Sequence, residues 1–340
     1  MMHRILHVTD CYSTGVGRAI DSIVALTPEH QHHLLWAGDD DPGQAGFASA
    51  RALPRGLPLR VRAVRRAVTR TGSDIVHAHS SRAGVYARLT KLDARVLYQP
   101  HAYKLLDPTL PRHARAAITL VERLLGPRTD AVLVLSEQER ALAARLSPDA
   151  THVLLPNVPS LAPAVSPAPA FHARVRPAPV VVMAGRVSPQ KDPGYLVAVA
   201  ELLGRHSPDV TVRWLGGEED PQLSTQLRAA GVEVTGWLAR EDLVTALGEA
   251  GVYLHSAAYE GFPLSVLDAA ACGLPVIVRD IPAFAGTPLT RVTRPEDAAA
   301  TALEVLRGGD AWRTSRTGAE ELLTSMDPAV QRARLAELYR

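Results

Sequence analysis

The chain of 340 residues is about twice as long as a typical domain, and its 46% hydrophobic and 21% charged residues suit a globular protein with an ample core. Its longest apolar runs are of strand length, which excludes a bilayer-spanning helix, and its two cysteines exclude a disulfide framework. Residues 1–157 hold 20 Lys/Arg against 14 Asp/Glu, whereas the remainder holds 17 against 21. We therefore expect two domains in a reducing cytoplasm, without a signal peptide.

The first half alternates between strand-like and helix-like segments. Strands are predicted at Arg4–Thr9, His33–Ala37, Ile75–Ala78, Val96–Gln99 and Ala131–Leu135. Helices are predicted at Gly17–Ala25, Leu59–Thr69, Gly84–Lys91, Leu110–Leu125 and Glu137–Leu146. This alternation predicts a parallel sheet flanked by helices, here an N-terminal α/β domain over residues 1–157.

A stretch rich in proline and alanine follows without periodicity, so residues 158–179 are predicted to be a linker. In the second half, strands are predicted at Val180–Ala184, Thr211–Leu215, Val232–Thr235, Val252–His255 and Val276–Val278. Helices are predicted at Gly194–Arg205, Pro221–Ala230, Arg240–Glu249, Pro263–Ala271, Pro295–Arg307, Ala319–Ser325 and Val330–Arg340. These elements predict a second α/β domain over residues 180–340, whose last helix is a candidate to pack on the first domain.

The most informative stretch is Y-E-G-F-P-L-S-V-L-D-A-A-A-C-G-L-P-V at 259–276, which follows a predicted strand and opens a helix. Ligands of doubly wound sheets bind at such strand ends. Pro263 suits the first helical position, and the free amides near Leu264 to Val266 attract phosphate groups. The carboxylates of Glu260 and Asp268 can accept paired hydrogen bonds from sugar or ribose hydroxyls.

A second polar group follows the first strand of the second half, in M-A-G-R-V-S-P-Q-K-D at 183–192. Gly185 frees the backbone to turn, while Arg186 and Lys191 bring two positive charges to the strand end. Such a pair can neutralise a diphosphate leaving group as charge develops on it.

Together these motifs resemble the retaining glycosyltransferases of family 4 (group 1), which have the GT-B fold. The family's hallmark is E-G-F-G-L with a second Glu eight residues after the first, followed by A-x-A-x-G-x-P-V. The resemblance implies two Rossmann-like doubly wound α/β domains that face a central cleft. This chain departs at Pro263, which replaces a Gly, and at Asp268, which replaces the second Glu. Because Asp is one methylene shorter, its contact with the ribose requires a shifted helix.

The resemblance also implies roles for individual residues. The implied catalytic residues are Glu260 on the transferred sugar, Arg186 and Lys191 on the diphosphate, and His101. The implied donor-binding residues are Gly15, Gly17, Gly185, Gly216, Trp237, Leu238, Gly261, Phe262, Pro263, Leu264, Ser265 and Asp268. Trp237 either flanks the nucleobase or belongs to the core. His255, which precedes the acidic motif, is expected to be structural.

Two sites are predicted in the first half. Gly15 and Gly17 follow the first strand and allow close approach of the backbone to a phosphate, with a plain turn as the alternative. The family has a histidine at the position of His101 that reaches the donor sugar, commonly followed by Gly, where this chain has Ala102. A neutral imidazole can donate one hydrogen bond and accept another, which suits a sugar hydroxyl.

Three further patterns are interpreted as structural. Ser136 and Glu139 fit an S-x-x-E capping box. His77 and His79 have the spacing that puts both rings on one strand face, but the sequence shows no third metal ligand nearby. The run Asp39–Asp41 resembles a metal motif of another glycosyltransferase fold and is interpreted as a solvated turn.

Two other functions compete with a transferase. An NAD enzyme would use Gly15 and Gly17 in a dinucleotide fingerprint, but Ile20 occupies the third glycine position. A catalytically silent GT-B subunit would explain the changes at Pro263 and Asp268.

The resemblance implies retaining transfer without a metal or cofactor, in which the departing phosphate takes the acceptor's proton. The expected partners are a nucleotide-diphosphate sugar and a lipid-linked or small-molecule acceptor, as in bacterial cell-surface polysaccharide synthesis, and no nucleic acid. The segment Arg51–Arg70 has seven arginines and no acid. It is either a solvated helix face or a contact for anionic lipid at the inner membrane face.

Overall fold

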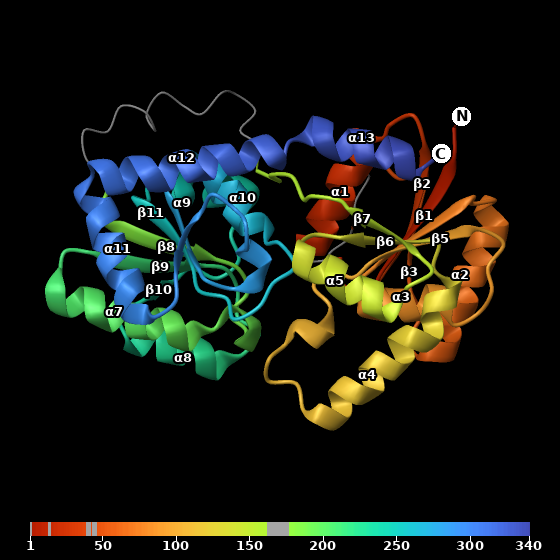
Figure 1. Ribbon diagram of the computed structural model, residues 1–340, viewed down its shortest axis with the longest axis horizontal. Coiled ribbons are helices and arrows are strands. Elements are labelled where there is room, and N and C mark those ends of the chain that lie inside the picture. Colours follow the sequence, from red (N-terminus) through yellow and green to blue (C-terminus); the bar gives the residue numbers. More distant parts are fainter. Residues whose placement is uncertain (1, 13–14, 39–41, 43–45, 162–176) are drawn as a thin grey trace. The chain divides into compact units, whose positions relative to one another are not determined.

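The computed structural model describes residues 2–340 except 13–14, 39–41, 43–45 and 162–176 (Figure 1). Thr14, the run Asp39–Asp41 and most of the predicted linker lie outside the described residues. The chain divides into two compact units: unit 1 comprises Met1–Val158 and Asp327–Arg340, and unit 2 comprises Pro159–Met326. Each unit has its own sheet with helices on both faces (Figure 1).

Unit 1 is built on a parallel sheet in the order β3-β2-β1-β4-β5-β6-β7. Its strands are β1 Arg4–Thr9, β2 Gln31–Trp36, β3 Ser49–Ala52, β4 Ile75–His79, β5 Arg95–Gln99, β6 Ala131–Val134 and β7 Thr151–Leu154. Its helices are α1 Gly15–Leu26, α2 Leu57–Thr71, α3 Ser81–Arg88, α4 Arg112–Leu125, α5 Glu137–Leu146 and α13 Pro328–Leu338. The strand order reverses between β1 and β4, the point at which doubly wound sheets bind ligands.

Unit 2 repeats this arrangement with a parallel sheet in the order β10-β9-β8-β11-β12-β13. Its strands are β8 Val180–Ala184, β9 Thr211–Leu215, β10 Glu233–Val234, β11 Val252–His255, β12 Val276–Arg279 and β13 Thr290–Val292. Its helices are α7 Pro193–His206, α8 Pro221–Ala229, α9 Arg240–Gly248, α10 Leu264–Ala271, α11 Pro295–Arg307 and α12 Asp310–Ser325. The order reverses here between β8 and β11.

Alternation along β1 sends its side chains to the two faces of the unit 1 sheet. Leu6 packs in a cluster with Val64 of α2, whereas Ile5 packs with Ile23 of α1 and Leu335 of α13. The C-terminal helix α13 is therefore part of the core of unit 1, and it also contacts α1 directly.

The predicted fold class is confirmed, since both units are parallel α/β sheets. The sequence does not predict the short strands β3, β7 and β13. Strand β3 reads S-A-R-A and is mostly exposed at the sheet edge, so neither alternation nor hydrophobicity marks it. Arg51 consequently lies in a strand, and the helix of the basic segment begins only at Leu57.

Several helix boundaries also differ, among them those of α3, which spans Ser81–Arg88 where the prediction is Gly84–Lys91. The helix predicted at Ala319–Ser325 is only the end of α12, which begins at Asp310, because its polar first half hides the helical periodicity. The helix predicted from Pro263 begins at Leu264, and Pro263 is its N-cap.

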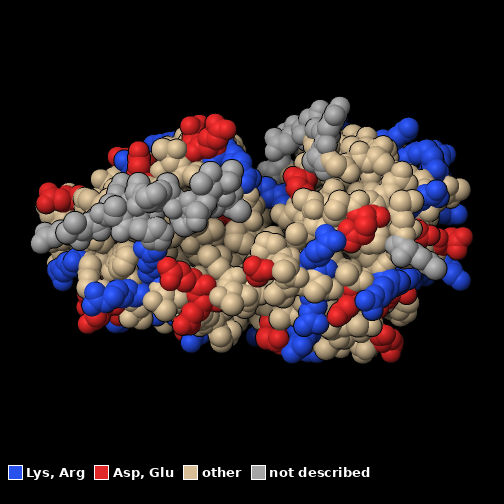
Figure 2. Space-filling view, turned by 90° about the horizontal axis from the view of Figure 1, so that it is seen from above, with Lys and Arg blue, Asp and Glu red and all other residues tan. Residues whose placement is uncertain are grey.

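Each helix in the described part of the chain is too short or too polar to span a bilayer. On the face drawn in Figure 2, positive and negative side chains are interspersed within each unit. The difference in net charge between the two halves of the chain therefore does not give that face a single sign.

Candidate functional site

The two motifs of unit 2 meet at the carboxyl ends of β8 and β11, the neighbouring strands at which the strand order reverses. The loop after β8 carries Lys191, and the loop after β11 carries Glu260. Backbone and side-chain hydrogen bonds join the loops, from Ala258 N to Gln190 O at 2.9 Å and from Ser256 Oγ to Lys191 O at 2.7 Å. The residues predicted from separate motifs therefore form one local structure.

Two glycines make room for the loop after β8. Gly185 has φ +149°, and a Cβ there would lie 3.0 Å from the Cε atom of Lys191. Gly216 has φ +152°, and a Cβ there would lie 2.1 Å from the carbonyl oxygen of Gly185, which also accepts a hydrogen bond from Trp214 Nε1 at 2.7 Å. Any side chain at Gly216 would displace the turn that carries Lys191.

The carboxylate of Glu260 is held by groups on both loops. Lys191 Nζ forms an ion pair with Oε1, and Gln190 Nε2 donates to Oε2 at 3.2 Å. His255 Nε2, on a fully buried ring, lies 3.5 Å from Oε1. The side chain of Glu260 is only 8% exposed, so this is a buried anion with a defined orientation.

Electrostatics keeps Glu260 ionised. Burial alone would raise the pKa of Glu260, but Lys191 and then His255 outweigh it and lower that pKa to about 2. Burial lowers the pKa of His255, so its ring is neutral at ordinary pH. The site therefore holds one fixed negative charge against one fixed positive charge, with a neutral imidazole beside them.

Helix α10 begins four residues after Glu260. Among the described residues no side chain caps α10. Val266 N donates to Pro263 O at 3.2 Å, which leaves the amides of Leu264 and Ser265 for an anionic group. Ser265 in the first turn accepts a hydrogen bond from Tyr253 OH at 2.9 Å, which fixes the helix start against β11. Gly261, Phe262, Pro263 and Leu264 are buried, and Phe262 packs edge-on against Phe284.

Sequence reasoning missed a clamp on the loop after β8. Asp192 has φ +48°, caps α7 by accepting from Tyr195 N at 3.2 Å, and pairs with Arg279 at 2.5 Å. The guanidinium of Arg279 also lies 4.6 Å from the centre of the Tyr195 ring. The pair Asp192-Pro193 at the start of a helix was the available signal, since Asp is a preferred N-cap and Pro a preferred N1 residue.

Arg186 leaves the same strand end as Lys191 but is more exposed. Its side chain is 37% exposed and forms an ion pair with Glu219 at 3.2 Å. It is therefore a surface cation whose present partner is weakly held, and its contact with a diphosphate stays a prediction.

Asp268 accepts hydrogen bonds from residues at the start of unit 2. It is 1% exposed and accepts hydrogen bonds from the amides of Ser160 at 2.7 Å and Leu161 at 2.9 Å, and from Ser160 Oγ. Asp268 thus fastens the segment at Ser160 to α10. Its contact with a ribose stays a prediction and would compete with these bonds.

Trp237 is 64% exposed, so the alternative that it is a core residue is wrong. Its loop is tied to the loop after β9 by a bridge between Gly216 and Gly236, and a Cβ at Gly217 would lie 2.1 Å from Trp237 Nε1. Leu238 beside it is half-buried. The indole therefore stands as an accessible ring next to the glycine turns.

In unit 1, the loop after β5 has an unusual backbone. His101 and Ala102 have φ +52° and +84°, in the left-handed region that strains residues with a Cβ. Glu139 holds this loop, because its Oε1 accepts from Ala102 N at 2.8 Å and Tyr103 N at 3.2 Å. Strained backbone held in this way is common at functional sites.

The capping-box prediction for Glu139 is wrong in part. Ser136 Oγ does accept from Glu139 N at 3.3 Å and caps α5. The Glu139 carboxylate, however, accepts from Leu135 N and from the loop after β5. Burial raises the pKa of Glu139 to about 6, against the backbone amides that lower it.

The glycines after β1 have a steric explanation. A Cβ at Gly17 would lie 1.9 Å from the carbonyl oxygen of Tyr12, so this position in α1 requires glycine. Gly15 is half-buried at the first residue of α1. Their phosphate contact stays a prediction.

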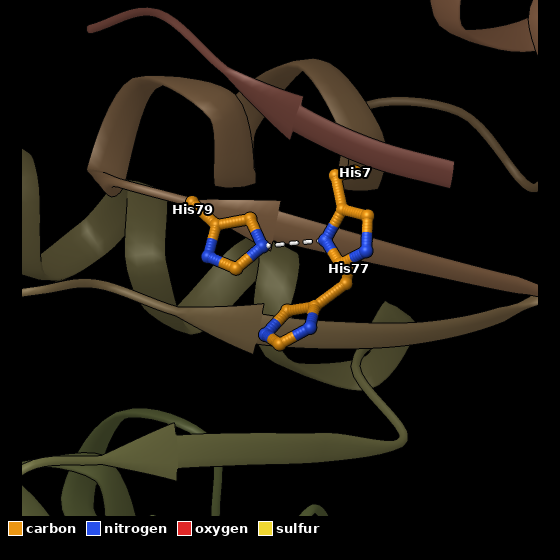
Figure 3. A group of neighbouring side chains, drawn as sticks. All are labelled: His7, His77 and His79. Atoms are coloured by element: carbon orange, nitrogen blue, oxygen red, sulfur yellow. Dashed lines mark hydrogen bonds between the residues drawn. The ribbon is translucent and has the colours of Figure 1, made fainter. Parts of the chain in front are cut away.

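The histidine pair of β4 has a neighbour that the sequence did not reveal. Figure 3 shows His7 of β1 beside His77 and His79, and the ligand atoms of the three rings lie within 4.8 Å of one another. All three are fully buried. Strand pairing puts His7 opposite His77 in the register of β1 and β4, which spacing along one strand cannot indicate.

Two family models match the chain. A glycosyl transferase 4-like domain matches residues 7–158, and glycosyl transferases group 1 match residues 178–307. The chain is also similar to the UDP-Gal:alpha-D-GlcNAc-diphosphoundecaprenol alpha-1,3-galactosyltransferase of Escherichia coli. The two are 25% identical over an alignment of 228 residues, which covers 61% of this chain and 58% of that protein. The match therefore spans somewhat more than half of that relative.

Solved structures resemble the chain over nearly its whole length, including one from Thermosynechococcus elongatus and one from Anabaena. The sucrose-phosphate synthase of Thermosynechococcus elongatus has a TM-score of 0.80 at 18% identity over 99% of this chain and 98% of that one. HepE of Anabaena, in complex with UDP and glucose, has a TM-score of 0.80 at 16% identity over 99% of each chain. At these identities the likeness shows the fold alone, and it confirms the GT-B fold. With both family models matched in order along its length, the chain belongs to glycosyltransferase family 4 (group 1).

Proposed function

We propose that the protein transfers a sugar, with retention, from a nucleotide-diphosphate sugar to an acceptor. The observation that carries this proposal is the ionised, buried Glu260, which Lys191 holds at the strand reversal of unit 2, directly before the uncapped start of α10. An oriented carboxylate beside a cation and a helix N-terminus suits sugar hydroxyls attached to a diphosphate.

The proposed chemistry is electrostatic. Arg186, Lys191 and the first amides of α10 stabilise the diphosphate as it departs, and a phosphate oxygen takes the proton of the acceptor hydroxyl. Glu260 accepts hydrogen bonds from the transferred sugar, Trp237 flanks the nucleobase, and His101 of unit 1 contacts a sugar hydroxyl. These cations supply the charge that a metal would otherwise provide.

The relatives indicate which substrates to try first. The Escherichia coli relative is named for a UDP-galactose donor and a diphosphoundecaprenol-linked acceptor, and HepE was crystallised with UDP and glucose. We propose a UDP-sugar donor and a lipid-linked acceptor of cell-surface polysaccharide synthesis, with a small-molecule acceptor as the alternative.

Arg186→Ala is expected to slow transfer by ~10²-fold or more, because a charge-stabilising group is removed from the leaving diphosphate. The measurement is kcat/KM for transfer from a UDP-sugar. Arg213→Ala is the matched control, since Arg213 also forms ion pairs with glutamates in unit 2 but lies on β9 facing Glu233 and Glu249. A loss below about threefold for Arg186→Ala would contradict its assignment.

The silent-subunit alternative makes a different prediction for the wild-type protein. Such a subunit would bind UDP but neither transfer nor hydrolyse the sugar from any member of a panel of nucleotide sugars and acceptors. Transfer or donor hydrolysis that disappears in Glu260→Gln supports the active enzyme instead.

We also propose that unit 1 binds to the cytoplasmic face of an anionic membrane. Six of the seven arginines of the segment Arg51–Arg70 are exposed, and α4 exposes Leu120, Val121 and Leu124 at 59%, 43% and 65%. A hollow of about 420 Å³ on α4 is lined by Arg112, Arg115 and Arg123 among others. Apolar side chains flanked by arginines suit an interfacial position on anionic lipid.

Leu120→Ser with Leu124→Ser is expected to weaken binding to phosphatidylglycerol vesicles by ~10-fold or more, because two exposed leucines that the lipid interface would bury are lost. Co-sedimentation measures this, with phosphatidylcholine vesicles for comparison. Val330→Ser, which changes an exposed apolar residue of α13, is the control. Equal binding of all three proteins would contradict the contact through α4.

A further inference from the structure

Four histidines form a continuous line across the sheet of unit 1. They come from β2, β1, β4 and the loop after β5, which are neighbours in the sheet. His32 Nδ1 lies 3.0 Å from His7 Nε2, His7 Nδ1 lies 3.0 Å from His79 Nε2, and His79 Nδ1 lies 3.0 Å from His101 Nε2. Figure 3 shows the central bond between His7 and His79. We call these four residues the histidine chain.

His32, at the end of the histidine chain farthest from His101, fixes the direction in which the hydrogen bonds are donated. His32 Nε2 lies 2.9 Å from the carbonyl oxygen of Thr27, which can only accept a hydrogen bond. Thr27 Oγ1 already donates to Ile23 O at 2.6 Å, so it too can only accept from His32. Burial lowers the pKa of His32, so the ring is neutral and carries a single proton. That proton lies on Nε2, and Nδ1 is an acceptor.

The tautomer of His32 determines the tautomer of each following ring. A neutral imidazole has one N–H and one acceptor nitrogen, so His7 must donate from Nε2 and accept at Nδ1, and His79 must do the same. Burial lowers the pKa of His7 and His79 well below the usual value and that of His101 to about 3, which keeps the rings neutral. His101 then donates from Nε2 to His79.

We propose that the histidine chain holds His101 in its Nε2–H tautomer, so that Nδ1 is always an acceptor for a substrate hydroxyl. His101 is half-buried, and no residue that the structure describes bonds to its Nδ1. His79, His7 and His32 are then positioning residues for His101, up to three rings away from it. The substrate part of this inference rests on the proposed function, whereas the tautomer does not.

The group formed by His7, His77 and His79 is suited to hydrogen bonding and not to binding a cation. The ring nitrogens of His7 and His79 are used within the histidine chain, and His77 accepts from Tyr339 OH at 3.0 Å and donates to Gln99 Oε1 at 3.2 Å. The group of three histidines includes no carboxylate or thiolate to balance a divalent ion in this buried place.

The test is the tautomer of His101 in the full chain labelled with ¹⁵N-histidine, read from long-range ¹H–¹⁵N correlation spectra. The inference expects an Nδ1 resonance typical of an unprotonated nitrogen and an Nε2 resonance typical of N–H. A ring that is cationic, or protonated on Nδ1, overturns the inference without any substitution. So does a stoichiometric shift of the His7, His77 and His79 resonances on addition of Zn²⁺, which would make the cluster a metal site.

A substitution of His32, three rings away from His101, tests the histidine chain as a unit. His32→Leu removes the end that sets the direction, so His101 is expected to show mixed tautomers and transfer is expected to fall by ~10-fold through kcat. His32→Gln is expected to restore both, since an amide can donate to Thr27 O and accept from His7. His33→Gln is the control, because the neighbouring His33 bonds to Ser49 and not to the chain.

The outcomes separate the two proposals. A single Nε2–H tautomer in a protein that transfers no sugar supports the histidine chain and overturns the proposed function. An active enzyme in which His32→Leu leaves the His101 tautomer unchanged overturns the histidine chain and leaves the proposed function standing.

Discussion

Lys191→Ala is expected to slow sugar transfer by ~10²-fold or more, the cost of losing a charge that stabilises the leaving group. Two effects combine in this variant. The diphosphate loses a cation, and Glu260, only 8% exposed, loses its closest positive partner. Steady-state kinetics with a UDP-sugar measures the effect.

The same variant changes how Glu260 responds to pH. Because the folded-state pKa of Glu260 is about 2, below its usual 4.5, ionised Glu260 contributes stability that is fully present above pH 4.5 and is lost as the pH falls toward 2. Without Lys191 that pKa should rise, so acid unfolding should begin at higher pH. Adding Glu260→Gln removes the unpaired charge and should restore stability but not activity. Full activity in Lys191→Ala would remove the basis for the proposed chemistry.

Glu122→Ala is expected to lower the free energy of unfolding by about 3–5 kcal/mol, because it leaves a buried guanidinium without a counter-charge. Arg88 is fully buried, and its Nη2 atom lies 2.9 Å from Glu122 Oε2. Tyr98 OH donates to the other oxygen at 3.0 Å, and the Arg88 guanidinium lies 3.8 Å from the centre of the Tyr98 ring. This network joins α3, β5 and α4, just before the loop that carries His101.

Urea unfolding followed by circular dichroism measures that loss. The control is Glu29→Ala, whose exposed pair with Arg332 at 3.4 Å should contribute less than ~1 kcal/mol. Replacing both partners, as Arg88→Met with Glu122→Leu, should recover most of the stability, since no charge then remains buried. A loss for Glu122→Ala no larger than for Glu29→Ala would contradict the account of the buried pair.

Helices and strands are predicted well from the sequence where their burial produces a regular hydrophobic pattern. Strands β1 and β8 and helices α5 and α11 have the predicted bounds, because runs of buried residues and terminal prolines or serines mark them. Strands β3 and β13 lie at sheet edges, where partial exposure removes the apolar pattern. Edge strands depend on pairing with a neighbour, which is not a local property.

In the candidate site, too, local patterns are predictable from the sequence and long-range contacts are not. Motif spacing places Lys191 and Glu260 after their strands, but their ion pair joins residues 69 positions apart and appears only when β8 and β11 pair. The clamp between Asp192 and Arg279 is likewise long-range. The histidine chain is the extreme case, since its four rings meet only through the order of four neighbouring strands.

Calorimetric titration of UDP into the wild-type protein and into Lys191→Ala is the most direct test of a diphosphate site at the strand reversal of unit 2. We predict saturable binding of UDP, much weaker binding of uridine, and an affinity for UDP at least ~10-fold lower in the variant. Equal affinity of the two proteins for UDP, or equal binding of UDP and uridine by the wild type, would show that Lys191 does not hold a diphosphate.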